Sequence, residues 1–164
     1  MKKILHIGST LYTILMIGFI GFFIGIRLNG GEGIGPWQFR AVLSESMQET
    51  YPVGSLLVTK QVPIKDIKEG DVLSMQIGET VLSHRIVHKF RQEDDYVFQT
   101  KGDSNTKKDP FVVKENQILG KVVLGIPSLG KFLLKLQTAN GKIAFFLLLI
   151  ELYLLQTFIK LIWS

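Results

Sequence analysis

The sequence predicts a mostly β chain, in which a small antiparallel β domain lies between an N-terminal and a C-terminal transmembrane helix. Three observations carry this prediction. Ile4–Ile26 contains no formally charged residue, and Ile143–Ile162 is apolar except at four positions. Between these two ends, short segments alternate apolar and polar residues and are separated by turn-forming sequences, as half-buried strands are.

The N-terminal segment 1–28 is predicted to be a membrane anchor. At 1.5 Å per residue, Ile4–Ile26 is long enough to cross a hydrocarbon core about 30 Å thick. Lys2 and Lys3 precede the segment and favour a cytoplasmic N-terminus, although Arg27 weakens the charge asymmetry. A cleaved signal peptide and a buried soluble helix are the alternatives; the long apolar run favours the uncleaved anchor, because signal-peptide cores usually have about 7–15 residues.

A glycine-rich linker, 29–40, is predicted next, with Asn29–Pro36 as a flexible loop. The β domain then occupies 41–130. Within it we expect strands at Arg40–Leu43, Ser55–Lys60, Asp71–Gln76, Val81–Phe90, Tyr96–Lys101 and Lys121–Gly125.

The C-terminal part is predicted to hold a connector and a second span. Pro127 and Gly130 precede a short amphipathic helix in the connector 131–142, and the span occupies 143–164. Glu151 is costly in such a span, so an interfacial or partner-packed helix is the alternative. Two spans would return the C-terminus to the cytoplasm and leave the β domain outside.

Composition excludes several function classes. The net charge of +5 comes from 19 basic and 14 acidic residues, but the basic residues form no long run, which argues against a nucleic-acid partner. The chain has no cysteine, and this excludes disulfides, thiolate catalysis and cysteine-ligated metals.

Three segments contain the residue types that a serine nucleophile needs. A serine becomes nucleophilic when a base lies in hydrogen-bond reach, and a carboxylate helps to orient that base. The segments are Leu43–Met47, Leu82–Val87, and Thr100–Asn105 continuing to Asp109. Taken singly, each has an ordinary structural interpretation: a turn, a strand histidine, or a Gly-Asp turn.

Taken together, these segments resemble the type I signal peptidases, over roughly Val42 to Leu129. The boxes of that family stand here in the family's order, as Ser44–Met47, Gly70–Val72, Ser83–Val87, Thr100–Asn105 and Asp109. His84 stands where most bacterial members have lysine. The resemblance is therefore to the branch of the endoplasmic reticulum, archaea and some Gram-positive bacteria.

The resemblance implies a membrane-bound serine endopeptidase that removes N-terminal signal peptides, without a cofactor or metal. Ser46 would be the nucleophile and His84 its base. The Ser46 amide and the Ser44 hydroxyl would hold the oxyanion. The acid that orients His84 remains open between Asp109, which we prefer, and Asp103, which would then fix the Gly102 turn.

The resemblance also implies the partners. These are secretory preproteins with small side chains at the first and third residues before the cut, and the plasma membrane, with the β domain on its extracytoplasmic side; accessory subunits stay open. An extended substrate would pair with strand edges formed by Ala41, Val42, Leu43, Val81, Leu82 and Ser83. Trp37, Phe39 and Met47 would either rest on lipid headgroups or pack in the core.

Glu45 and Glu49 depart from the family, which usually has glycine and proline there. Glu45 would oppose an oxyanion unless its side chain points to water, so an inactive relative is one alternative. A membrane adaptor on the same fold and a self-cleaving or repressor-type protease are others. A metal site on His84 and His88 is disfavoured, because a strand would separate them by about 13 Å.

Overall fold

The computed structural model describes residues 8, 10–18, 20–21, 33–92 and 95–162. The chain forms two compact units. Residues 32–132 make up one unit, and residues 1–31 with 133–164 make up the other. The first unit contains the sheet, and the second contains long helical segments.

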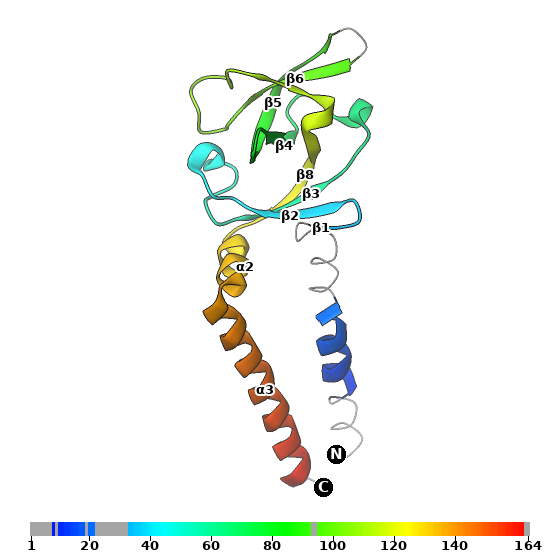
Figure 1. Ribbon diagram of the computed structural model, residues 1–164, viewed down its shortest axis with the longest axis vertical. Helices are drawn as coiled ribbons and strands as arrows, with labels where there is room; N and C mark the ends of the chain where they lie inside the picture. Colours follow the sequence, from blue (N-terminus) through cyan, green and yellow to red (C-terminus); the bar gives the residue numbers. More distant parts are fainter. Residues whose placement is uncertain (1–7, 9, 19, 22–32, 93–94, 163–164) are drawn as a thin grey trace. The chain divides into compact units, whose positions relative to one another are not determined.

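The sheet unit is one antiparallel sheet with strand order β1-β2-β3-β8-β4-β5-β6-β7, in which β8 joins β1–β3 to β4–β7 (Figure 1). The strands are β1 Gly33–Ile34, β2 Trp37–Ala41, β3 Leu56–Lys60, β4 Val72–Ile77, β5 Thr80–Gln92, β6 Asp95–Lys101, β7 Val112–Lys114 and β8 Ile118–Ile126. Three single-turn 3-10 helices interrupt them: η1 Glu45–Met47, η2 Ile64–Asp66 and η3 Glu115–Gln117.

Strand β5 is the longest strand and has different neighbours along its length. Its first part pairs with β4, so that His84 lies opposite Leu73. Its second part pairs with β6, from Arg85 opposite Lys101 onward. Among the described strands, none pairs with the other edge of β5 before Arg85. The chain that leaves β6 after Lys101 therefore starts beside His84.

Two groups of buried apolar side chains form the core of the sheet unit. One group contains Ile67, Leu73, Met75, Ile86, Phe98 and Val113. The other group contains Val42, Met47, Leu57, Val72 and Val122. Met47 is only 2% exposed, which decides its role in favour of core packing and makes the headgroup interpretation wrong for this residue. Trp37 is 38% exposed and Phe39 is half-buried.

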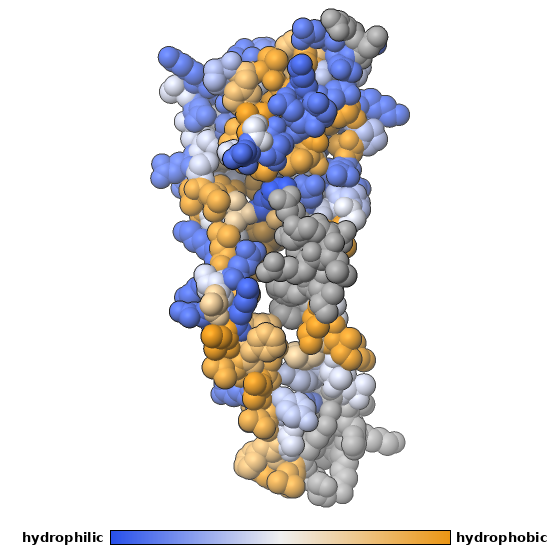
Figure 2. Space-filling view, viewed as in Figure 1, coloured by the Kyte–Doolittle hydropathy of each residue, from blue (hydrophilic) through white to orange (hydrophobic). Residues whose placement is uncertain are grey.

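The C-terminal helices are α2 Leu129–Gln137 and α3 Ala139–Ile162. Thr138 separates them, and its hydroxyl accepts a hydrogen bond from the Gly141 amide at 3.1 Å, which caps the start of α3. Ala139–Ile159 is long and apolar enough to cross a membrane, and apolar side chains follow α3 along its length (Figure 2). The segment predicted as the second span is thus helical, but α3 already starts at Ala139, inside the predicted connector 131–142.

The described residues within 8–21 are also helical. The remainder of the predicted span Ile4–Ile26 lies outside the described residues, so the N-terminal anchor stays a prediction.

The structure corrects three expectations. The mostly β prediction fits the sheet unit but not the whole chain, because the part of the chain from Leu129 to Ile162 is almost entirely helical in α2 and α3. Part of the expected loop is instead a hairpin, because Gly35 adopts φ +58° and turns β1 back along β2. The strand expected at Arg40–Leu43 is β2, which starts at Trp37 and ends at Ala41.

Candidate active site

Ser46 lies in η1, the element that follows β2 along the chain. Ser44 is extended, with φ −122° and ψ 164°, and the chain then closes one 3-10 turn in which the Gln48 amide donates to the Glu45 carbonyl. Met47 anchors this turn in the core. Since amides in the first turn of a helix have no intrahelical acceptor, the Ser46 N–H is left for another partner.

His84 joins Ser46 to Asp109 in one row. Its Nε2 atom lies 3.0 Å from Ser46 Oγ, and its Nδ1 atom lies 2.7 Å from Asp109 Oδ2. The histidine is 5% exposed, so water competes little for these bonds. A hydroxyl, an imidazole and a carboxylate in this order can move a proton off the hydroxyl and stabilise the resulting imidazolium.

The neighbouring strand holds Asp109 in place. The Thr100 hydroxyl donates to Asp109 Oδ2 at 2.6 Å, and the Asp109 amide donates to the Thr100 carbonyl at 2.9 Å. Gln99 Nε2 donates to the Asp109 carbonyl at 2.8 Å. The carboxylate that faces His84 is therefore positioned by β6.

Asp103 pairs with Arg85. The guanidinium donates through Nε to Oδ1 at 2.8 Å and through Nη2 to Oδ2 at 2.6 Å, and the Thr50 hydroxyl also donates to Oδ2. Burial raises the pKa of Asp103, but the hydrogen bonds from Arg85 and Thr50 outweigh it, so the net pKa lies below the ordinary value. The hydrogen bond to Asp103 raises the pKa of Arg85.

The turn that carries Asp103 packs directly against η1. The Ser104 amide donates to the Ser46 carbonyl at 2.9 Å, and the Asp103 amide donates to Met47 Sδ at 3.3 Å. A Cβ atom on Gly102 would lie 2.6 Å from the Ser46 carbonyl oxygen, so this approach requires glycine. The Ser104 hydroxyl accepts a hydrogen bond from the Glu49 amide at 3.2 Å.

Three polar side chains around Ser46 are exposed: Ser44, Glu45 and Glu49. Ser44 Oγ lies 3.2 Å from Ser46 Oγ. Glu45 and Glu49 are both exposed to solvent. Because water screens an exposed carboxylate, the charge of Glu45 opposes an oxyanion at Ser46 only weakly.

The residues predicted to bind substrate lie on two strand segments. Val42 is buried and pairs with the 54–55 segment, because its amide donates to the Ser55 carbonyl at 2.9 Å and its carbonyl accepts from the Gly54 amide at 2.8 Å. Leu43 is 75% exposed, and Ala41 ends β2. Val81, Leu82 and Ser83 are half-buried in β5, next to His84 and along the edge that no described strand occupies.

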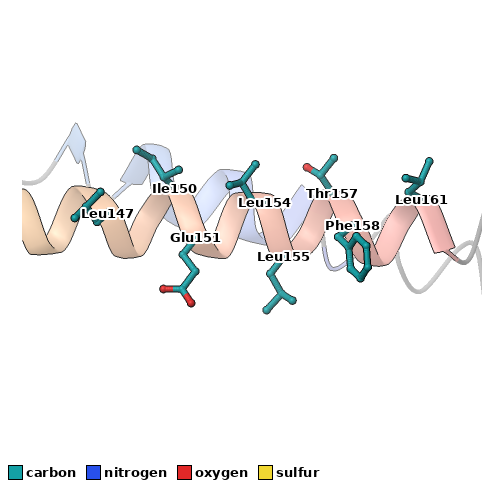
Figure 3. A pocket seen from close by; sticks show the side chains of 8 residues that line it. All are labelled: Leu147, Ile150, Glu151, Leu154, Leu155, Thr157, Phe158 and Leu161. Carbon is teal, nitrogen blue, oxygen red and sulfur yellow. The ribbon is translucent and has the colours of Figure 1, made fainter.

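Two other features contain none of the residues of this row. His88 is exposed, and its Nδ1 atom lies 3.9 Å from Glu69 Oε1. A shallow hollow on α3 is lined by apolar side chains together with Glu151 and Thr157, and in Figure 3 Glu151 projects from the same side of the helix as Leu155. None of the residues in the row lines this hollow.

Four residues at the site had no role predicted from the sequence: Arg85, Thr50, Thr100 and Gln99. Arg85 and Thr100 lie inside the recognised boxes, so their positions gave a signal. Thr50 and Gln99 gave none, because both lie outside these boxes, and Thr50 contacts Asp103 across 53 positions of the chain.

An antiparallel sheet that holds a serine, a histidine and an aspartate in one hydrogen-bonded row has the arrangement used by serine hydrolases. The chain is 34% identical to Signal peptidase I W of Bacillus subtilis (strain 168) over 121 residues. The match covers 72% of this chain and 64% of that protein, so the chain spans less than two thirds of the relative's length. No family model matches the chain. Over these 121 residues, the chain is therefore similar to a type I signal peptidase.

Proposed function

We propose that this protein is a membrane-bound serine endopeptidase that removes N-terminal signal peptides from exported preproteins. One observation carries the chemical part of the proposal: His84 lies within hydrogen-bond distance of both Ser46 and Asp109. The similarity to Signal peptidase I W supports the substrate class.

In the first step, Ser46 Oγ attacks the scissile carbonyl carbon and its proton passes to His84 Nε2. Asp109 accepts the Nδ1 proton in a hydrogen bond, which fixes the tautomer and stabilises the imidazolium. The tetrahedral intermediate then collapses, the C–N bond breaks, and Nε2 returns the proton to the leaving amine. Water next attacks the Ser46 ester by the same route and releases a carboxylate.

The oxyanion is held by the Ser46 amide and the Ser44 hydroxyl. The amide sits in the first turn of η1 and has no intrahelical acceptor, which supports this role. The Ser44 hydroxyl lies 3.2 Å from Ser46 Oγ, which supports a donor close to the carbonyl group that Ser46 attacks.

The substrate binds as an extended segment between Ala41–Leu43 and Val81–Ser83. The unoccupied edge of β5 supports this proposal, because its backbone groups can pair with a peptide in the manner of an added strand. The same edge leads to His84, so a peptide paired there would present its carbonyl near Ser46. We propose small side chains at the first and third residues before the cut.

The protein crosses the plasma membrane twice, with the sheet unit on the extracytoplasmic side. The length and composition of Ala139–Ile159 support a span in α3. Glu151 in that span requires a proton, a polar partner or a wet cavity. The predicted span Ile4–Ile26 provides the second crossing.

The test compares membranes that contain the wild-type protein or Ser46→Ala, each incubated with a labelled secretory precursor. We expect mature product with the wild type and unprocessed precursor with the variant. Equal processing by the two proteins would refute the assignment of Ser46, and equal absence of product would favour a non-enzymatic adaptor.

A further inference from the structure

Helix α2 combines an apolar stripe with exposed lysines. Leu129, Phe132, Leu133 and Leu136 follow the i, i+3, i+4, i+7 spacing that places side chains on one face of a helix. Phe132 is 56% exposed, which is unusual for a large aromatic side chain of a sheet-adjacent helix. Lys131 and Lys135 fall on the opposite face and are also exposed.

The charge around α2 has one sign. Between Glu115 and Glu151 the sequence contains no aspartate or glutamate, whereas it contains Lys121, Lys131, Lys135 and Lys142. A helix with an apolar stripe and lysines on its polar face is typical of segments that lie in the headgroup region of an anionic bilayer. Each lysine near such a surface adds attraction that depends on the lipid charge.

The covalent neighbour of α2 determines where it lies. Only Thr138 separates α2 from α3, so α2 lies within one residue of the segment proposed to cross the membrane. From this we propose that α2 is an anionic-lipid-binding helix, with Phe132 and its stripe in the interface and Lys135 and Lys142 at the phosphates. The proposal rests on the span assigned to α3 under the proposed function.

Binding of α2 to lipid would also hold the proposed substrate-binding segment around Val42 at a fixed distance from the bilayer surface. The Lys131 amide donates to the Gly54 carbonyl at 3.0 Å, and the Gly54 amide donates to the Val42 carbonyl at 2.8 Å. A Cβ atom on Gly130 would lie 2.4 Å from the Ser55 carbonyl oxygen, so the first turn of α2 is packed closely on this segment. Two hydrogen bonds thus connect the proposed lipid-binding helix to Val42.

The absence of cysteine makes the test direct. Three single-cysteine variants of the full chain carry a polarity-sensitive fluorophore: Phe132→Cys, Lys135→Cys and Leu148→Cys. Each variant is reconstituted in vesicles of phosphatidylcholine alone and in vesicles of phosphatidylcholine with phosphatidylglycerol. We expect the Leu148 label to report hydrocarbon in both. We expect the emission of the label at position 132 to shift to shorter wavelength, and a lipid-bound quencher to reduce it, with both effects stronger in vesicles that contain phosphatidylglycerol. The label at position 135 should report a polar environment in both kinds of vesicle.

Charge removal provides the matched control. In the Phe132→Cys background, Lys135→Gln and Lys142→Gln should each lower the ratio of lipid-bound to unbound α2 in anionic vesicles by about fivefold. Lys65→Gln should leave this ratio unchanged. A Phe132 label that reads as aqueous in both vesicles, with the Leu148 label in hydrocarbon, overturns the role of α2 alone. A Leu148 label that reads as aqueous overturns the proposed span and with it this inference.

Discussion

Two aspartates from one sequence box have different neighbours in the structure. Asp109 faces His84 at 2.7 Å, while Asp103 forms two hydrogen bonds with Arg85. Sequence alone left the choice between them open, because both follow Gly102 within one loop. The geometry favours Asp109 as the residue that orients the base and Asp103 as the residue that holds the loop against η1.

Asp109→Asn should lower kcat by about four orders of magnitude, because an amide favours the wrong imidazole tautomer. Precursor cleavage by purified protein in vesicles measures this effect, and circular dichroism checks the fold. The exposed Asp66→Asn serves as the control and should keep full activity. A folded Asp103→Asn variant that loses activity, together with an active Asp109→Asn variant, would reverse the assignment.

Asp103 should also make stability depend on pH. Because its folded pKa is below the unfolded value of about 3.9, its contribution is fully present above that pH and is lost as pH falls through the lower, folded pKa. Asp103→Asn should therefore cost about 1–2 kcal/mol near neutral pH, and this difference should shrink below about pH 4. Denaturant unfolding of both proteins over this pH range measures it; a constant difference would contradict the ion-pair explanation.

Ser44→Ala tests the proposed second oxyanion donor. Loss of one such donor typically lowers kcat by about 10²–10³-fold, because the charge is stabilised only in the transition state. We expect this loss in kcat with KM and thermal stability nearly unchanged, since Ser44 is exposed. An unchanged kcat would remove Ser44 from the oxyanion site.

At the scale of elements, the strands that the sequence predicted best are those of at least five residues that are bounded by turn-forming sequences. β3, β4, β5 and β6 agree with the expected segments to within one or two residues at each end. β1 and β7 have two and three residues, which is too short for any periodic pattern to appear. The start of β2 was missed because the glycines before Trp37 indicated a loop.

The packing of the 102–105 turn against η1 predicts a role for Ser104. Its hydroxyl accepts the Glu49 amide, so Ser104→Ala should lower kcat/KM by about two- to tenfold, the effect of one hydrogen bond. Ser104→Thr keeps the hydroxyl and should restore most of the activity, and Thr106→Ala in the same loop is the matched control. If the alanine and threonine variants behave alike, the hydroxyl has no positioning role.

At the scale of the molecule, the chain combines a sheet unit with helical segments that differ in solvent preference. The sheet unit has its own buried core, whereas large side chains along α3 remain exposed, such as Phe146 at 66% and Leu161 at 77%. Exposed apolar surface on this scale is stable in lipid rather than in water. Hydropathy alone therefore predicted the C-terminal helix. The residues of the row around His84 were predicted only through the family resemblance, and the contact of Asp109 with His84 joins segments that are distant in the chain.

The proposed two-span arrangement predicts which parts of the chain a membrane-impermeant maleimide can reach. Since the chain has no cysteine, a single Glu79→Cys substitution in the exposed turn between β4 and β5 reports on the sheet unit. It should be labelled in intact cells, because that unit lies outside. A cysteine appended after Ser164 should be labelled only after lysis, since two crossings return the C-terminus to the cytoplasm. If both positions are labelled in intact cells, the number of crossings between the two termini is odd, or a helix lies on the membrane surface. The two-span arrangement would then be wrong.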